Sequence, residues 1–148
     1  MSNTATHTKS LTRTYSTRMP CSAHAPRLCR KTLGLYLTVD GFDAIVDNAG
    51  VCVSEIVTNV VQHTESPDLV LTVTVRQAEV YVEVRDRGSA LIPVPPVPPE
   101  RPPLEASEES GRGLLLVDSL ASRWGVEYFG GARRPYGKCV WFELGAAR

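Results

Sequence analysis

Between Leu91 and Pro103 the chain carries seven of its eleven prolines. Proline lacks a backbone N–H and fixes φ, so this stretch excludes both a helix interior and a central strand. A long irregular loop inside a compact domain is usually functional or disordered. The regular structure of the chain must therefore be built from the segments on either side of this loop.

Two helices are predicted ahead of the loop. The first runs from Ala25 to Leu37, because Pro26 suits a first helical turn and the leucines that follow form an approximate apolar face. The second begins near Phe42 and ends before Ser66. Its valines favour a strand by propensity, but its polar residues recur as pairs every four positions, which is a helical period.

The remaining segments read as strands around one more helix, and the strands adjoin in pairs. This order predicts an α+β fold, a two-layer α/β sandwich whose mixed, mostly antiparallel sheet is covered by helices on one face. The predicted segments are an edge strand at 13–19, strands at 69–75, 80–84, 124–129 and 138–144, and a helix at 113–121.

Composition narrows the class of protein. The 148 residues suffice for one domain, which we place at residues 13–148 after a Ser/Thr-rich tail at 1–12 that we expect to be disordered. Sixteen basic and sixteen acidic residues cancel, so charge gives no case for direct nucleic-acid or membrane binding. The N-terminus lacks an apolar signal region, and no apolar run reaches roughly 18 residues. The four cysteines lack zinc spacing, and we expect reduced thiols in a cytoplasmic protein.

Glu55, Asn59 and His63 recur every four positions and therefore form one polar stripe on the second predicted helix. A carboxylate near a reacting group can accept a proton, and an amide oxygen is a hard, neutral ligand for Mg²⁺. Taken alone, the same spacing is also typical of the solvated face of an amphipathic helix.

Three short glycine-containing motifs stand at segment ends. Asp86–Gly88 follows a strand, where it either ends the strand or offers an acidic group beside a glycine that lets a flat ring approach. Gly111–Gly113 is either a flexible junction before a helix or a source of backbone N–H groups for an anion. Gly137–Cys139, taken in isolation, is typical of a hairpin turn. Neither a P-loop nor a dinucleotide-binding fingerprint occurs in the sequence.

In this order and spacing, the four motifs together resemble those of the bacterial anti-sigma-factor serine/threonine kinases. VSEIVTNVVQHT (53–64) resembles the N box of that family, and VEVRDRGSALIPVP (82–95) resembles its first glycine box. SGRGLLLVDSLASRWGV (110–126) resembles the second glycine box, and GKCVWFEL (137–144) resembles the last. The resemblance covers about residues 26–144. It implies the Bergerat (GHKL) ATP-binding fold of histidine kinases, gyrase and mismatch-repair ATPases, with a lid loop at about 88–112.

The resemblance also implies a role for each motif residue. Asn59 would hold Mg²⁺ against the phosphates of ATP, and Glu55 would be the catalytic base for the attacking hydroxyl. Asp86 would accept a hydrogen bond from the adenine amino group. The other residues implied to contact ATP are His63, Gly88, Gly111, Arg112, Gly113, Leu114, Lys138 and Cys139.

Two positions depart from the family pattern. Ala90 replaces the second glycine of the first glycine box, and Cys139 stands where the last box often has threonine. An alanine at positive φ is strained, and a thiol is a poorer hydrogen-bond donor to an adenine-bound water than a hydroxyl. Both departures are expected to weaken ATP affinity. The proline-rich lid is also compatible with a PxxP docking segment.

The function implied by the resemblance is that of an ATP-dependent regulatory kinase. It would act as an anti-sigma factor by binding a sigma factor or sigma-like regulator, and it would phosphorylate a serine of an anti-anti-sigma protein. Family members tend to form homodimers. One alternative is a non-catalytic, nucleotide-gated binding module, and another is a GHKL-type ATPase in which Glu55 activates water. A detached histidine-kinase half usually carries Asn rather than Glu at the position of Glu55.

Overall fold

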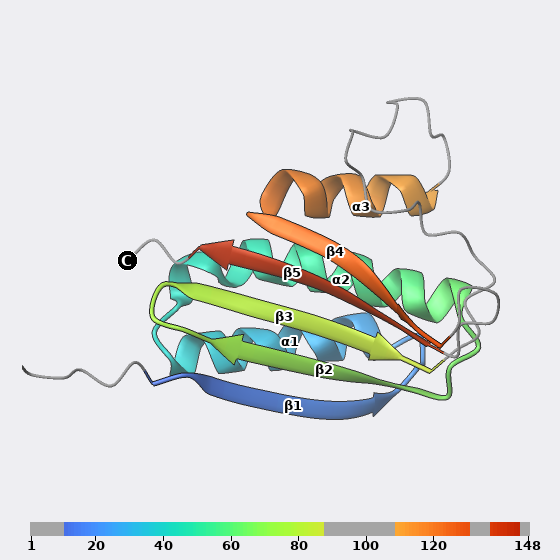
Figure 1. Ribbon diagram of the computed structural model, residues 1–148, viewed down its shortest axis with the longest axis horizontal. Helices are drawn as coiled ribbons and strands as arrows, with labels where there is room; N and C mark the ends of the chain where they lie inside the picture. Colours follow the sequence, from blue (N-terminus) through green and yellow to red (C-terminus); the bar gives the residue numbers. More distant parts are fainter. Residues whose placement is uncertain (1–10, 88–108, 131–136, 146–148) are drawn as a thin grey trace, which may run out of the picture.

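The computed structural model describes residues 11–87, 109–130 and 137–145, and these residues form a sheet with helices on one face (Figure 1). Of the predicted tail at 1–12, only residues 11 and 12 are described. The lid segment at 88–108, which contains Gly88 and Ala90, lies outside the described residues. The elements are β1 (Arg13–Pro20), α1 (Ala25–Val39), a 3-10 turn (Asp43–Ile45), α2 (Val46–His63), β2 (Asp68–Val75), β3 (Glu79–Asp86), α3 (Glu109–Leu120), β4 (Arg123–Phe129) and β5 (Gly137–Gly145).

The strands form one sheet in the order β1-β2-β3-β5-β4. The predicted α+β sandwich is confirmed, but its mixed sheet is not, because every pairing of the described strands is antiparallel. The reason lies in the last hairpin. β3 and β4 run in the same direction, and the insertion of β5 between them replaces a parallel contact with two antiparallel ones.

The hydrophobic core lies between the sheet and the two long helices, which pack side by side (Figure 1). Side chains alternate across a strand, so each core strand contributes every second residue. Full burial of one such valine or leucine contributes about 1.5–3 kcal/mol. In β2 and β3 the buried core residues are Leu69, Leu71, Val73 and Val75 of β2, and Val80, Val82 and Val84 of β3.

The helix α2 confirms that the four-residue spacing of its polar side chains outweighs the strand propensity of its valines. Its apolar residues face the core, among them the fully buried Val53, Val57 and Val60. By length and composition alone, Asp43–His63 would also be apolar enough to cross a membrane. In this fold the same apolar side chains pack against the sheet and α1.

The helix α3 begins at Glu109, earlier than the predicted start at Gly113. The glycines at 111 and 113 therefore lie inside its N-terminal half rather than ahead of it. A Cβ placed on Gly113 would lie 2.8 Å from Oε2 of Glu55 on α2. Gly113 thus permits the close approach of two helices, a role that neither sequence interpretation, the flexible junction or the anion-binding helix start, had included.

Candidate active site

Gly88 lies outside the described residues, and the other predicted site residues belong to the elements that meet at one end of the molecule, where α2 and β3 end and where α3 and β5 begin (Figure 1). The strand register pairs Asp86 of β3 with Lys138 of β5. The packing of α3 on α2 brings Gly113 to Glu55. Two clusters result, one on the helices and one on the strand ends.

The helix cluster is the polar stripe of α2. Glu55, Asn59 and His63 are each half-buried and share one face of the helix because they are spaced by four residues. The carboxylate of Glu55 points to α3, since Oε2 is the nearest atom to a Cβ built on Gly113. The Nε2 atom of His63 is buried and has no hydrogen-bond partner among the described residues. The stripe therefore begins with Glu55 against α3 and ends with His63, the last residue of α2.

The strand cluster is a buried ion pair. The alternation that buries Val82 and Val84 puts the next residue on that face, Asp86, under the helices as well. Its side chain is fully buried, and the Lys138 side chain is 4% exposed, with 2.8 Å between Nζ and Oδ2. Two charges withdrawn from water gain little for folding unless further hydrogen bonds satisfy them. This ion pair is therefore weak evidence for stability by itself.

Gly137 sets the distance between the two strand ends. A Cβ built on it would lie 2.5 Å from the backbone oxygen of Asp86, a contact that real side chains do not make. Any larger residue would push the start of β5 away from the end of β3. The glycine that the sequence assigned to a turn is thus required by close packing against Asp86.

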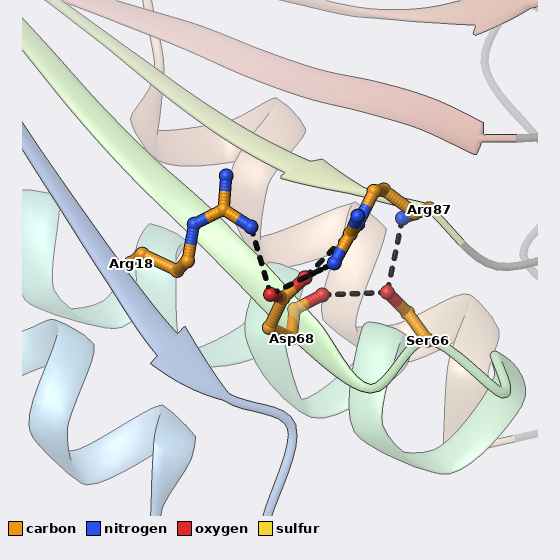
Figure 2. A network of polar contacts seen from close by, with 4 residues as sticks. All are labelled: Arg18, Ser66, Asp68 and Arg87. Atoms are coloured by element: carbon orange, nitrogen blue, oxygen red, sulfur yellow. Dashed lines mark hydrogen bonds and ion pairs between the residues drawn. The ribbon is translucent and has the colours of Figure 1, made fainter.

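A polar network fixes the chain immediately after Asp86, as Figure 2 shows. The guanidinium groups of Arg18 and Arg87 lie 2.8 Å and 3.0 Å from Oδ2 of Asp68. Ser66 Oγ accepts the backbone N–H of Arg87 at 3.0 Å and donates to the backbone oxygen of Asp68. The hydrogen bond from Arg18, with help from Arg87, lowers the pKa of Asp68. The network ties β1, β2 and the end of β3 together and so positions Asp86.

Cys139 lies on the opposite face of the sheet from Asp86. Its cross-strand neighbours are Arg85 and Glu127, and burial raises the pKa of its thiol to about 12. The structure thus brings Lys138, and not Cys139, to the side chain of Asp86. Of the remaining predicted residues, Leu114 is half-buried in α3, and Gly111 and Arg112 lie on its first turns.

Sequence reasoning missed Tyr128 as a candidate site residue. The register of β4 places it directly opposite Lys138, so Asp86, Lys138 and Tyr128 form one row across three strands. Tyr128 is 43% exposed, and partial burial together with the charge of Asp86 raises its pKa. The signal that would have found it is the pairing of β4 with β5. The sequence alone does not give the register between these two strands, and so it does not show that Tyr128 lies opposite Lys138.

The donor set fits ATP with Mg²⁺. Among the residues that the structure describes, no group of three or more His, Cys, Asp and Glu side chains could hold a metal ion by itself. Mg²⁺ usually keeps several waters and binds one or two protein ligands together with substrate phosphates. The amide of Asn59, beside the carboxylate of Glu55 on the next turn of α2, suits that arrangement. A Cβ on Gly113 would meet the Glu55 carboxylate, and one on Gly137 would meet the backbone of Asp86, so both glycines keep these two residues closely packed.

Comparisons with known proteins agree with this fold. The profile of the family described as histidine kinase-like ATPase domain matches residues 23–144. An uncharacterized protein of Streptomyces coelicolor, SCO4941, is 55% identical over 42 residues, which are 28% of this chain and 40% of that protein. The crystal structure of the RsbU and RsbW domains of Rv1364c from Mycobacterium tuberculosis matches with a TM-score of 0.64 and 20% identity.

The structural match covers 92% of this chain but only 33% of the Mycobacterium tuberculosis chain. The matched segments therefore cover less than half the length of either of these two proteins. At 20% identity, the likeness to the solved structure shows a shared fold alone. The family profile, in contrast, extends from the start of α1 to the end of β5 and includes all the described site residues.

Proposed function

Because the chain belongs to the histidine kinase-like ATPase domain family, we propose that it is an ATP-dependent serine/threonine protein kinase acting as an anti-sigma factor. Its partners would be a sigma factor or sigma-like regulator and an anti-anti-sigma protein, whose serine it phosphorylates. The observation that carries the proposal is the Glu55 carboxylate, one helical turn before Asn59 and facing α3. A kinase of this kind needs a proton acceptor next to the group that holds its metal ion.

Each residue of the site has a distinct task in this proposal. ATP with its Mg²⁺ supplies the phosphoryl group, and phosphoryl transfer depends mainly on positioning and charge neutralisation. Asn59 would hold the Mg²⁺ through its amide oxygen, and Glu55 would accept the proton of the serine hydroxyl. The first turns of α3 present backbone N–H groups, which favour anions. Asp86 would hold the adenine amino group.

The partner assignment rests on the sequence resemblance and on the fold shared with the Mycobacterium tuberculosis protein that contains an RsbW domain. We extend it to a homodimer as the assembly to be tested. We also propose a cytoplasmic location. The four cysteines, all free thiols, support a reducing compartment.

Phosphotransfer from labelled ATP to anti-anti-sigma proteins encoded near this gene tests the proposal. Glu55→Gln should slow transfer by about 10²-fold or more and leave ATP affinity unchanged or slightly improved, because a general base acts on the transition state. Asn59→Ala should abolish Mg²⁺-dependent ATP binding in calorimetry. The matched control is Asp47→Asn, which removes an exposed carboxylate from the first turn of the same helix.

Other results would assign a different function. Release of inorganic phosphate without labelling of any acceptor would make the protein a GHKL-type ATPase, in which Glu55 activates water. Binding of both ATP and partner without transfer or hydrolysis would make it a nucleotide-gated binding module. Equal transfer rates for Glu55→Gln and the wild type would remove Glu55 from the mechanism.

A further inference from the structure

The side chain nearest to Asp86 across the sheet is a lysine, and this lysine is as deeply buried as the carboxylate it meets. Lys138 Nζ lies 2.8 Å from Oδ2 of Asp86, and the two side chains are 4% and 0% exposed. Asp86 is the last core-facing residue of β3, and Lys138 is the first core-facing residue of β5. A buried ion pair stabilises a fold weakly at best, because desolvation offsets the attraction. Its place at the nucleotide end of the sheet indicates a role in binding.

The two groups together present a hydrogen-bond acceptor beside a hydrogen-bond donor. The carboxylate of Asp86 accepts on both oxygens, while the ammonium group of Lys138 carries several N–H donors and only part of them can point at Oδ2. The Watson–Crick edge of adenine has the complementary order, since its N6 amino group is a donor and the adjacent N1 is an acceptor.

We propose that Lys138 reads the nucleotide base together with Asp86 by donating a hydrogen bond to N1 of adenine. The inference rests on the proposed ATP site and adds a specificity-determining residue to it. Cys139 points to the other face of the sheet, so its thiol is not available for this contact. Lys138 is the cation that the register places beside Asp86 on the helix-covered face.

The other neighbours of the row support this assignment. Asp86 is flanked on β2 by the buried, apolar Leu69, and Lys138 is flanked on β4 by Tyr128. Arg87, the next cation along the chain, is held by Asp68 (Figure 2). Tyr128 is 43% exposed, so the row is dry at one end and open to solvent at the other. In such surroundings a charge-assisted hydrogen bond contributes more than one exposed to water.

Calorimetric titration of the wild-type chain with Mg²⁺ and matched nucleotides tests the inference without any variant. The probes are ATP, 1-deaza-ATP, which has C–H in place of N1, and 7-deaza-ATP, which keeps N1 and changes a distant ring position. We expect 1-deaza-ATP to bind at least about 10-fold more weakly than ATP, since a hydrogen bond to a charged group is lost. The affinity of 7-deaza-ATP should stay within a few-fold of that of ATP.

Variants then assign the effect to one side chain. Lys138→Met should bind ATP and 1-deaza-ATP equally, whereas Lys138→Arg should retain a preference for ATP. The matched control is Arg85→Met, which removes a cation next to Asp86 in sequence but on the opposite face of the sheet. If Lys138→Met does not fold, Asp86→Asn/Lys138→Met keeps the row neutral, and it too should not distinguish the two nucleotides.

Three results would overturn the inference while leaving the ATP site in place. They are equal wild-type affinity for ATP and 1-deaza-ATP, an unchanged preference in Lys138→Met, and tighter ATP binding by Lys138→Met. The last would make Lys138 a competitor that occupies the place of the base. ATP binding that depends on N1, without any phosphotransfer, would sustain the role of Lys138 and reject the kinase. A wild-type chain that binds neither nucleotide would reject the ATP site and this inference with it.

Discussion

Two buried carboxylates stand at opposite ends of the molecule, and they are paired in different ways. Asp40 follows α1 at the end away from the site, and its side chain is 2% exposed. It accepts hydrogen bonds from Arg13 and from the hydroxyl of Tyr15, both on the edge strand β1. Asp86, at the site end, meets Lys138 on a central strand.

The exposure of the cation separates the two pairs. Arg13 is 52% exposed and keeps water around most of its guanidinium group, so its contact with Asp40 fastens an edge strand to a helix end at little desolvation cost. Lys138 is 4% exposed and gives up its hydration almost completely. The first pair is a contact at an edge strand with a half-exposed cation, whereas both members of the second pair are withdrawn from water, as the proposed contact with the base requires of its two partners.

The largest expected effect comes from removing one cation at each end. Lys138→Met should lower the free energy of unfolding by about 3–5 kcal/mol, because it leaves a buried carboxylate without its counter-charge. Arg13→Met should cost clearly less, since Tyr15 still donates to Asp40 at 2.9 Å. Urea unfolding of the two variants, followed by circular dichroism, measures both losses.

A double variant sharpens that result. Asp86→Asn/Lys138→Met removes both charges of the site pair and should recover most of the lost stability, because the cost lies in the uncompensated charge. Equal losses for Lys138→Met and Arg13→Met would contradict the contrast between the two ends.

The fold could be predicted almost entirely because periodicity records which side chains face the core. The polar pairs of α2 and the alternation in β2 and β3 are local signals, and the elements that they predict are present. The place of β5 between β3 and β4 is not local. No period in the sequence records which strand becomes the neighbour of another, and the predicted mixed sheet was wrong for that reason.

For the site too, the sequence predicted what is local to one element and did not predict what depends on contacts between elements. Spacing along one helix was enough to group Glu55 with Asn59, because both lie on a single element. The partnership of Asp86 and Lys138 needs the register between two strands that are distant in sequence, and the sequence therefore left Lys138 without a defined role. For Gly113 the sequence offered a flexible junction or an anion-binding helix start, and it did not reveal the close contact with the carboxylate of Glu55, because that residue belongs to another helix.

A smaller effect is expected from the two glycines that bound β5, one at each end of the molecule. A Cβ on Gly137 would lie 2.5 Å from the backbone oxygen of Asp86, whereas one on Gly145 would lie 3.9 Å from Ser122 Oγ. Gly137→Ala should therefore cost about 1–3 kcal/mol of stability through overpacking, and should weaken ATP binding. Gly145→Ala should stay within about 0.5 kcal/mol of the wild type. Thermal unfolding and ATP titration of both variants provide the measurements, and equal effects would show that the strand ends are packed alike.

The smallest expected effect is a difference in how pH acts on the two ends. At the site end, the hydrogen bond from Arg18 lowers the pKa of Asp68 from its ordinary value of 3.8. Its contribution to stability is therefore complete above that value and is lost as pH falls toward the folded-state pKa. At the other end, the hydrogen bond to Asp40 raises the pKa of Tyr15 from 10.0. That contribution is complete below pH 10.0 and is lost as pH rises through the folded-state pKa.

Acid should thus loosen the Asp68 network of Figure 2, and alkali should loosen the contact between β1 and Asp40. The unfolding temperature measured against pH should fall less steeply on the acid side in Asp68→Asn and less steeply on the alkaline side in Tyr15→Phe. Each variant is the control for the other, because each removes the titrating group from one end only. The changes should be small, since both groups lie near solvent, where screening weakens their interactions. If either variant reduced the pH dependence of the unfolding temperature on both the acid and the alkaline side, the two ends would be coupled. The Asp40 contact would then affect the stability of the site.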